Sequence, residues 1–171
     1  MSMHAATAVL VLGAVVSLGA CAKQAPAPER AAEVTTEVAP VPAPTQALPL
    51  VVVHKSPSCG CCGLWVDHMR QAGFQVDVRD EDNVNPVKER VGVPYGKGSC
   101  HTAEVRGYFI EGHVPAADVK RLLAEKPDAK GLLLPGMPMG SPGMEMPDGH
   151  SEPYTVELVR RDGTTAAFAA H

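Results

Sequence analysis

Apolar and polar residues change their period along the first half of the folded part of the chain. The β-branched run 48–54, bounded by turn residues, is typical of a buried strand. Residues 62–72 instead carry apolar side chains at helical spacing, with Trp65 predicted in the core, and Gly73 stands where a helix C-cap belongs. Residues 74–78 then alternate apolar with polar, as a half-buried strand does. The three segments predict a βαβ unit.

Further helices and strands follow. Residues 82–91 predict a short helix with a proline in its first turn, and residues 103–110 predict one strand. Residues 115–126 have the pattern of an amphipathic helix. Two alternating segments within 154–169 flank an Asp-Gly turn and predict a hairpin. Together these elements predict an α/β fold of the thioredoxin-like kind, a small mixed sheet with flanking helices.

The N-terminal residues predict export from the cytoplasm. Residues 5–20 form an apolar run that is shorter than the ~20 residues a membrane span needs but suits a signal peptide. The run ends in Leu18-Gly19-Ala20-Cys21, which resembles the bacterial lipobox. We therefore expect a signal peptide over residues 1–20 and a lipidated Cys21, with a plainly cleaved signal or a retained anchor as alternatives. Because Ala22 stands where the inner-membrane retention signal would place Asp, the resemblance implies a periplasmic protein anchored in the outer membrane.

Composition divides the rest of the chain and excludes one class of partner. Residues 21–48 are rich in Ala, Pro, Glu, Thr and Val without apolar periodicity, so they are predicted to be a flexible linker. Residues 49–171 are predicted to be the thioredoxin-like, metal-binding domain. The chain has 15 Lys and Arg against 19 Asp and Glu, with a net charge of -4 and no basic block. Nucleic acid is therefore not expected as a partner.

Three cysteines stand between the first predicted strand and the N-terminus of the first helix. There, unpaired N–H groups and the helix dipole favour the thiolates of Cys59, Cys61 and Cys62. A thiolate is both a nucleophile and a ligand for soft metals, so this position leaves both functions open. Cys59 and Cys62 have the Cys-x-x-Cys spacing of a redox enzyme, but Cys61 would divert a simple dithiol exchange. Three clustered thiolates suit the bridging of several Cu(I) ions.

A fourth cysteine, Cys100, comes just before the strand predicted from residue 103. In a thioredoxin-like fold the loop entering that strand packs against the Cys-x-x-Cys turn, and in redox enzymes it carries a cis-proline. Here a thiol and the imidazole of His101 stand in its place. One alternative is two disulfides among the four cysteines, although three so close together are expected to pair poorly. A structural zinc site is a further alternative, but zinc usually takes two spaced pairs of ligands.

Methionine and histidine supply further candidate ligands. The Pro/Gly-rich segment 134–146 carries four methionines, including Met137 and Met139, without helical or strand order. Thioethers select Cu(I), so the group favours copper binding, while the alternative for any single Met is packing in the lid of the fold. Among the histidines, His101 is a candidate because it follows a cysteine, and His113 because it precedes a helix. The alternative for both is an ordinary surface or hydrogen-bonded histidine.

Several uncommon motifs together resemble the CopG-type copper-resistance family. They are Cys59-Gly60-Cys61-Cys62-Gly63 with Trp65, Ser99-Cys100-His101-Thr102, Gly107-Tyr108, Glu111-Gly112-His113-Val114-Pro115 and the methionine segment 135–145. The match covers about residues 51–168. The resemblance implies a thioredoxin-like fold, a role in copper tolerance and a cysteine-bridged multinuclear copper cluster. Its implied ligands are Cys59, Cys61, Cys62 and Cys100, with His101 as an additional candidate.

The sequence therefore predicts an extracytoplasmic protein of copper resistance or homeostasis that binds Cu(I), rather than an enzyme. The predicted metal ligands are Cys59, Cys61, Cys62, Cys100, His101, His113, Met137 and Met139. The expected partners are copper ions, other periplasmic copper-handling proteins, and the membrane through the lipidated Cys21. The alternative function is a thiol-disulfide or copper oxidoreductase of the thioredoxin-like type.

Overall fold

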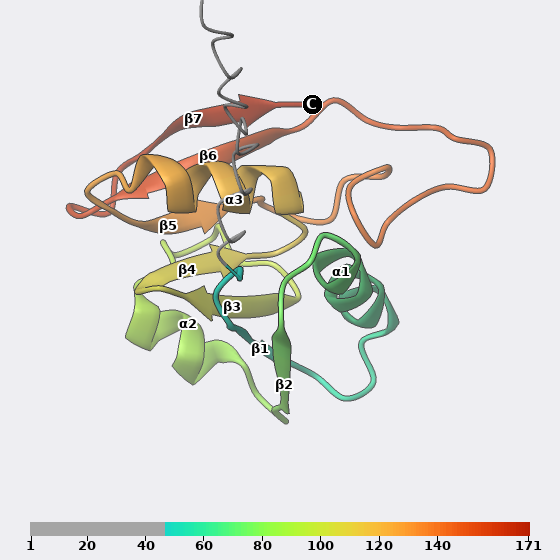
Figure 1. The fold of residues 1–171 in the computed structure, drawn as a ribbon, viewed down its shortest axis with the longest axis horizontal. Helices are drawn as coiled ribbons and strands as arrows, with labels where there is room; N and C mark the ends of the chain where they lie inside the picture. The colour runs from blue at the N-terminus through green and yellow to red at the C-terminus, as the bar shows by residue number, and fades with distance from the viewer. Residues whose placement is uncertain (1–46) are drawn as a thin grey trace, which may run out of the picture. The chain divides into compact units, whose positions relative to one another are not determined.

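A seven-stranded mixed sheet runs through residues 47–171, the part of the chain that the computed structural model describes. The strands lie in the order β2-β1-β3-β4-β5-β6-β7, from the bottom of Figure 1 to the top. They are β1 Val51–Lys55, β2 Val76–Asp80, β3 His101–Val105, β4 Tyr108–Glu111, β5 Ala129–Leu133, β6 Thr155–Arg160 and β7 Thr165–Ala170. β1 pairs with β2 and β4 with β5 in parallel, and the other neighbours are antiparallel. The predicted mixed sheet of an α/β fold is confirmed.

Three helices flank the sheet, and they fall on opposite faces. They are α1 Gly60–Gln71, α2 Asn85–Val91 and α3 Ala116–Glu125. Met69 of α1 and Leu122 of α3 belong to one buried cluster with Ile110 of the sheet. Phe109, the residue before Ile110 in β4, belongs to a second buried cluster. Val91 of α2 packs against this second cluster. Since successive residues of a strand point to opposite faces, α1 and α3 share one face and α2 covers the other.

The structure corrects one predicted strand and adds another. Residues 103–110, predicted as one strand, form the hairpin β3–β4, whose two-residue turn is Arg106-Gly107. Both residues have positive φ, 50° and 83°, as a tight hairpin turn with the twist of its strands requires. β5 was not predicted from the sequence. Its short apolar run directly follows a helix, and its Gly131 lies so close to the backbone of Phe109 that a Cβ would collide with it.

The predicted export and anchoring segments fall outside the described residues. The signal peptide over residues 1–20, the lipidated Cys21 and residues 22–46 of the linker therefore stay predictions. Within the described part, Leu48 already packs against the main core, one residue before the predicted start of the domain. No helix between residues 47 and 171 is both long enough and apolar enough to cross a membrane.

Candidate metal centre

The thiol turn, defined as residues 59–62, forms the N-terminus of α1. Cys59 is the N-cap residue, and Cys61 and Cys62 lie in the first helical turn. Cys59 and Cys62 form a disulfide, with their Cα atoms 5.4 Å apart. A helical turn brings residues three apart to the same side, so this pair is well placed for a disulfide. The third cysteine of the turn, Cys61, is a free thiol. Its Sγ lies 3.5 Å from that of Cys59.

The disulfide decides between two expectations about the cysteines. One pair is oxidised, while Cys61 and Cys100 are free thiols, so the alternative of two disulfides is wrong for this structure. The expectation that clustered cysteines pair poorly was also wrong for Cys59 and Cys62. That expectation was based on closeness in sequence alone. The helical turn separates the two Cα atoms far enough for a disulfide of normal geometry.

Cys100 reaches the thiol turn through strand pairing. β3 runs antiparallel to β1, and His101 pairs with Lys55, the last residue of β1. Cys100 therefore lies beside the end of β1, from which the chain turns into α1. The sulfur atoms of Cys59, Cys61, Cys62 and Cys100 all lie within 4.8 Å of one another. Four soft donors from two separate segments thus converge on one point.

Two buried imidazoles adjoin this sulfur cluster. Cys100 Sγ lies 3.0 Å from Nε2 of His113 and 3.5 Å from Nδ1 of His101, and both histidines are 0% exposed. The Trp65 ring packs 4.5 Å from the His101 ring, and its indole N–H donates to the carbonyl of Val114. Trp65 is fully buried, so its predicted place in the core is confirmed. It also forms one wall of the candidate site.

Burial sets the protonation of these groups. It lowers the pKa of His101 well below the usual value, with the nearby His113 and Lys88 adding to the effect, and it lowers the pKa of His113 as well. Both imidazoles are therefore neutral at neutral pH and keep a lone pair for a metal. Burial and the neighbouring Cys61 raise the pKa of Cys100 to about 11. A metal ion that binds Cys100 must therefore displace a proton.

The methionine loop, defined as residues 134–146, lies against the thiol turn. The Gly136 carbonyl accepts a hydrogen bond from the Ser99 hydroxyl at 2.6 Å. A Cβ added to Gly143 would come within 2.8 Å of both the Cys61 carbonyl oxygen and the Trp65 amide nitrogen. This close approach explains why glycine stands in the loop at that point, where φ is 85°.

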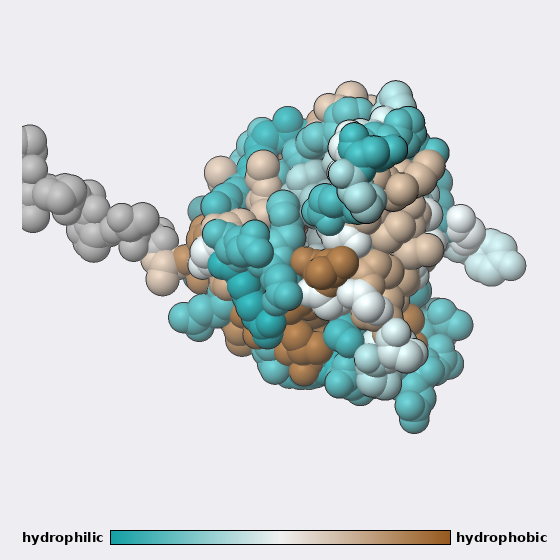
Figure 2. Space-filling model, turned by 90° about the vertical axis from the view of Figure 1, so that its right-hand side faces the viewer, coloured by the Kyte–Doolittle hydropathy of each residue, from teal (hydrophilic) through white to brown (hydrophobic). Residues whose placement is uncertain are grey.

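The methionines themselves differ in exposure. Met137 is 48% and Met146 37% exposed, while Met139 and Met144 are half-buried. On the side of the molecule where α1 and this loop lie, hydrophobic patches stand among hydrophilic surface (Figure 2). Metal binding by Met137 and Met139 stays a prediction.

A buried carboxylate that was not predicted from the sequence lies behind the site. Glu111 is 0% exposed, and it accepts hydrogen bonds at 2.6 Å from the backbone N–H of Ser99 and from the hydroxyl of Thr102. The ammonium of Lys88 forms an ion pair with the same carboxylate. These contacts hold the residues on both sides of Cys100. The sequence feature that could have indicated this role is the position of Glu111 directly before Gly112 and His113.

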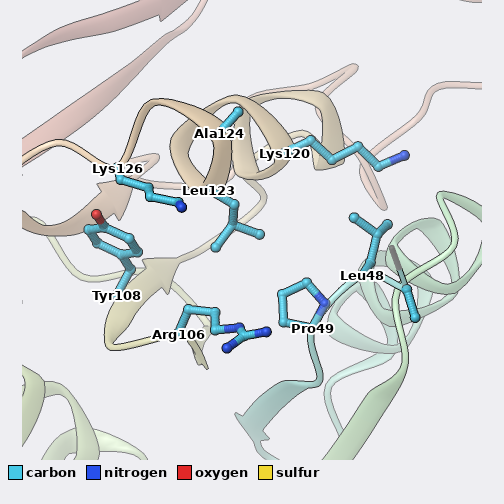
Figure 3. Close-up of a pocket in the computed structure, with 9 residues that line it drawn as sticks. Leu48, Pro49, Arg106, Tyr108, Lys120, Leu123, Ala124 and Lys126 are labelled. Atoms are coloured by element: carbon cyan, nitrogen blue, oxygen red, sulfur yellow. The ribbon is translucent and has the colours of Figure 1, made fainter. Parts of the chain in front are cut away.

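A cavity of about 560 Å³ lies elsewhere in the domain. Arg106, Lys120 and Lys126 line it together with Tyr108 and Leu123 (Figure 3). Arg106 follows the last residue of β3, whereas Cys100 precedes the first, so the two mark opposite ends of that strand. The chemistry of the thiols is therefore separate from this basic cavity.

This chain resembles known proteins both in sequence and in structure. Residues 97–144 match the family model described as "Protein of unknown function, DUF411". Two solved structures, of copper resistance protein CopG in form 1 and form 2, are each 44% identical to this chain. Each match covers 72% of this chain and 98% of the other, with TM-scores of 0.68 and 0.69. The chain belongs to the CopG family. No match was found among curated proteins.

Membership of the CopG family confirms the resemblance seen in the sequence motifs. The family model ends within the methionine loop and begins just before Cys100. It therefore covers Cys100, His101, His113 and Met137, whereas the thiol turn lies outside the residues that the family model matches.

Proposed function

We propose that this CopG-family chain is an extracytoplasmic copper-binding protein of copper resistance, which holds Cu(I) in a multinuclear, cysteine-bridged cluster. The observation that carries the proposal is the convergence of four sulfurs within 4.8 Å of one another. Thiolates that lie so close together can bridge soft, low-coordinate cations such as Cu(I). The name of its structural relatives, copper resistance protein, supports copper as the cargo.

The proposed ligands are the four cysteines, with imidazole and thioether donors around them. They are Cys59, Cys61, Cys62, Cys100, His101, His113, Met137 and Met139. The four-sulfur cluster requires the reduced chain, because the Cys59–Cys62 disulfide occupies two of the donors. A thiol reductant must therefore first supply two electrons and two protons to that bond, which returns Cys59 and Cys62 to free thiols.

Copper content in the cell tests this function. The protein is purified anaerobically from the periplasm of copper-treated cells and analysed for bound metals. Several copper ions per chain, absent from a Cys61→Ser/Cys100→Ser variant that retains its circular dichroism, support the proposal. Zinc in place of copper, or no metal in folded wild-type protein, would overturn it.

A second candidate function rests on the disulfide itself. Cys59 and Cys62 form a Cys-x-x-Cys disulfide at a helix N-terminus, the arrangement used for thiol-disulfide exchange. An oxidoreductase would turn over a disulfide substrate in the presence of a thiol reductant, and Cys59→Ser would abolish the turnover. Absence of turnover by the wild-type chain rejects this candidate.

The proposed location depends on Cys21 and on partners outside the domain. We place the protein in the periplasm, held at the outer membrane by a lipidated Cys21 and exchanging copper with other periplasmic copper-handling proteins. Labelling of cells with radioactive palmitate is expected to mark the wild-type chain and not a Cys21→Ser variant. Equal labelling of both chains, or of neither, argues against the anchor.

A further inference from the structure

Cys100, His101 and His113 form a second group of metal donors, which shares only Cys100 with the sulfur cluster. One ligand atom from each lies within 4.8 Å of the other two. Cys100 directly precedes β3, His101 is the first residue of β3, and His113 lies in the segment that joins β4 to α3. None of them takes part in the Cys59–Cys62 disulfide. This group therefore remains complete when half of the sulfur cluster is oxidised.

The orientation of His113 is fixed from behind. Its Nδ1 lies 2.7 Å from the carbonyl oxygen of Pro142. A carbonyl only accepts hydrogen bonds, so this contact assigns the proton to Nδ1 and leaves the lone pair on Nε2. Nε2 lies 3.0 Å from Cys100 Sγ. A histidine held through one nitrogen by a backbone carbonyl, with the other nitrogen facing a thiol, has the arrangement of a metal ligand.

His101 is held by packing against two rings and by one contact with Cys100. Its ring lies 4.5 Å from the ring of Trp65 and 5.1 Å from that of His113. Its Nδ1 faces Cys100 Sγ at 3.5 Å, and its buried Nε2 has no hydrogen-bond partner among the described residues. Leaving a buried polar atom unpaired lowers the stability of the fold. A stability role alone does not account for a histidine kept at that cost beside a cysteine.

We propose that the disulfide form of the chain binds one divalent cation through Cys100, His101 and His113. One thiolate and two imidazoles suit cations of intermediate softness, Cu(II) and Zn(II), rather than clusters of Cu(I). This inference rests on the proposed copper function only for the identity of the metal that the site binds in the cell. The oxidation state of Cys59 and Cys62 thus selects between two sites that share Cys100, a sulfur cluster in the reduced chain and a mononuclear site in the oxidised chain.

Cobalt titration of the oxidised chain tests the proposal. Mass spectrometry first establishes the Cys59–Cys62 disulfide, and Co(II) is then added anaerobically. One equivalent is expected to bind, with the visible bands of tetrahedral Co(II) and a thiolate-to-cobalt charge-transfer band. His113→Gln is expected to weaken binding at least tenfold, whereas His150→Ala, which removes an exposed histidine, should leave it unchanged. Cys100→Ser should remove the charge-transfer band, and Cys61→Ser should retain it.

Competition with Zn(II) and Cu(II) identifies the metal that the site prefers, and reduction of the sample distinguishes this inference from the proposed function. One equivalent of Zn(II) that bleaches the cobalt bands identifies a zinc-preferring site, whereas Cu(II) that displaces cobalt and gives an intense thiolate-to-copper band identifies copper. No cobalt bands in folded oxidised protein, or bands that survive Cys100→Ser, would overturn the inference. If the same sample then binds several Cu(I) ions after reduction, the proposed function stands without this site. If the oxidised chain binds cobalt but the reduced chain takes up no Cu(I), this site stands and the proposed function fails.

Discussion

Cys100 and His113 face each other at the open end of the β3–β4 hairpin, with Sγ and Nε2 3.0 Å apart. Thr102 pairs with Glu111 in that hairpin, so two residues further along each strand the register leads to Cys100 and His113. The tight turn at Arg106-Gly107 therefore fixes which imidazole meets the thiol. Residues thirteen apart in sequence become neighbours by strand pairing alone.

Replacing Cys61 by Ser is expected to lower the number of copper ions bound per chain and leave the fold intact. The variant keeps the helical backbone of the thiol turn and loses one bridging sulfur. Anaerobic Cu(I) titration against a chelator measures the stoichiometry, and circular dichroism checks the fold. Ser58→Ala, an exposed change beside the same turn, is the control and should bind copper like wild type. Unchanged copper content in folded Cys61→Ser would contradict the bridging role.

Replacing Gly143 by Ala is expected to destabilise the domain more than the same change at Gly149. Both glycines have positive φ, 85° and 76°, so both variants carry backbone strain of about 1 kcal/mol. A Cβ at Gly143 also collides with backbone atoms of Cys61 and Trp65, whereas one at Gly149 meets nothing within 4 Å. We expect Gly143→Ala to lose about 2 kcal/mol more in urea unfolding. Equal losses would show that the loop moves away freely.

Replacing Glu111 by Gln is expected to lower the free energy of unfolding by about 3 kcal/mol, because it leaves the Lys88 ammonium without its buried counter-charge. The control is Asp67→Asn. Its ion pair with Arg70 is more exposed, with side chains 59% and 50% exposed, and its loss should cost less than about 1 kcal/mol. Urea unfolding of the metal-free proteins measures both. Similar losses in the two variants would mean that Glu111 does not brace the Cys100 segment as described.

The raised pKa of Cys100 predicts how its alkylation depends on pH. In the metal-free, oxidised chain the pKa rises from 9.0 to about 11 through burial and the nearby Cys61. Alkylation by iodoacetamide should therefore keep rising with pH to about 11, whereas in the unfolded chain it levels off above 9. Peptide mapping by mass spectrometry identifies the labelled cysteine. A rate that levels off near pH 9 in the folded chain would contradict the shift.

The same shift affects stability with a definite sign. Below pH 9 Cys100 is protonated in both the folded and unfolded states, and the thiol has no effect on the pH dependence. Between pH 9 and about 11 only the unfolded state releases the proton, so the free energy of unfolding falls over that range. A Cys100→Ser variant should show a smaller fall over the same range.

Local pattern predicted much of this fold, and strand pairing explains most of what it missed. The change of period from the first strand to the first helix predicted β1 and α1, and the Asp-Gly turn predicted the β6–β7 hairpin. The β3–β4 turn was missed because its pair, Arg106-Gly107, is not one of the Asn-Gly or Asp-Gly pairs that mark a two-residue hairpin turn. That omission concealed the register that joins Cys100 to His113.

The residues of the candidate site could be predicted from the sequence, but their disulfide pairing and their buried contacts could not. Residue type and spacing drew attention to the four cysteines and to His101 and His113, which the structure brings together. The buried role of Glu111 depends on the Ser99 backbone and on Lys88, 23 residues away, which no local pattern reveals. The pairing of Cys59 with Cys62, rather than with Cys61, follows from the direction of side chains in a helical turn.

Anaerobic Cu(I) titration of the fully reduced chain tests the central claim most directly. If the sulfurs of residues 59–62 and of Cys100 bind soft cations jointly, several Cu(I) ions should bind per chain with high affinity, and x-ray absorption should show sulfur ligands and short copper–copper distances. A single weakly bound copper, or copper without sulfur ligands, would contradict it.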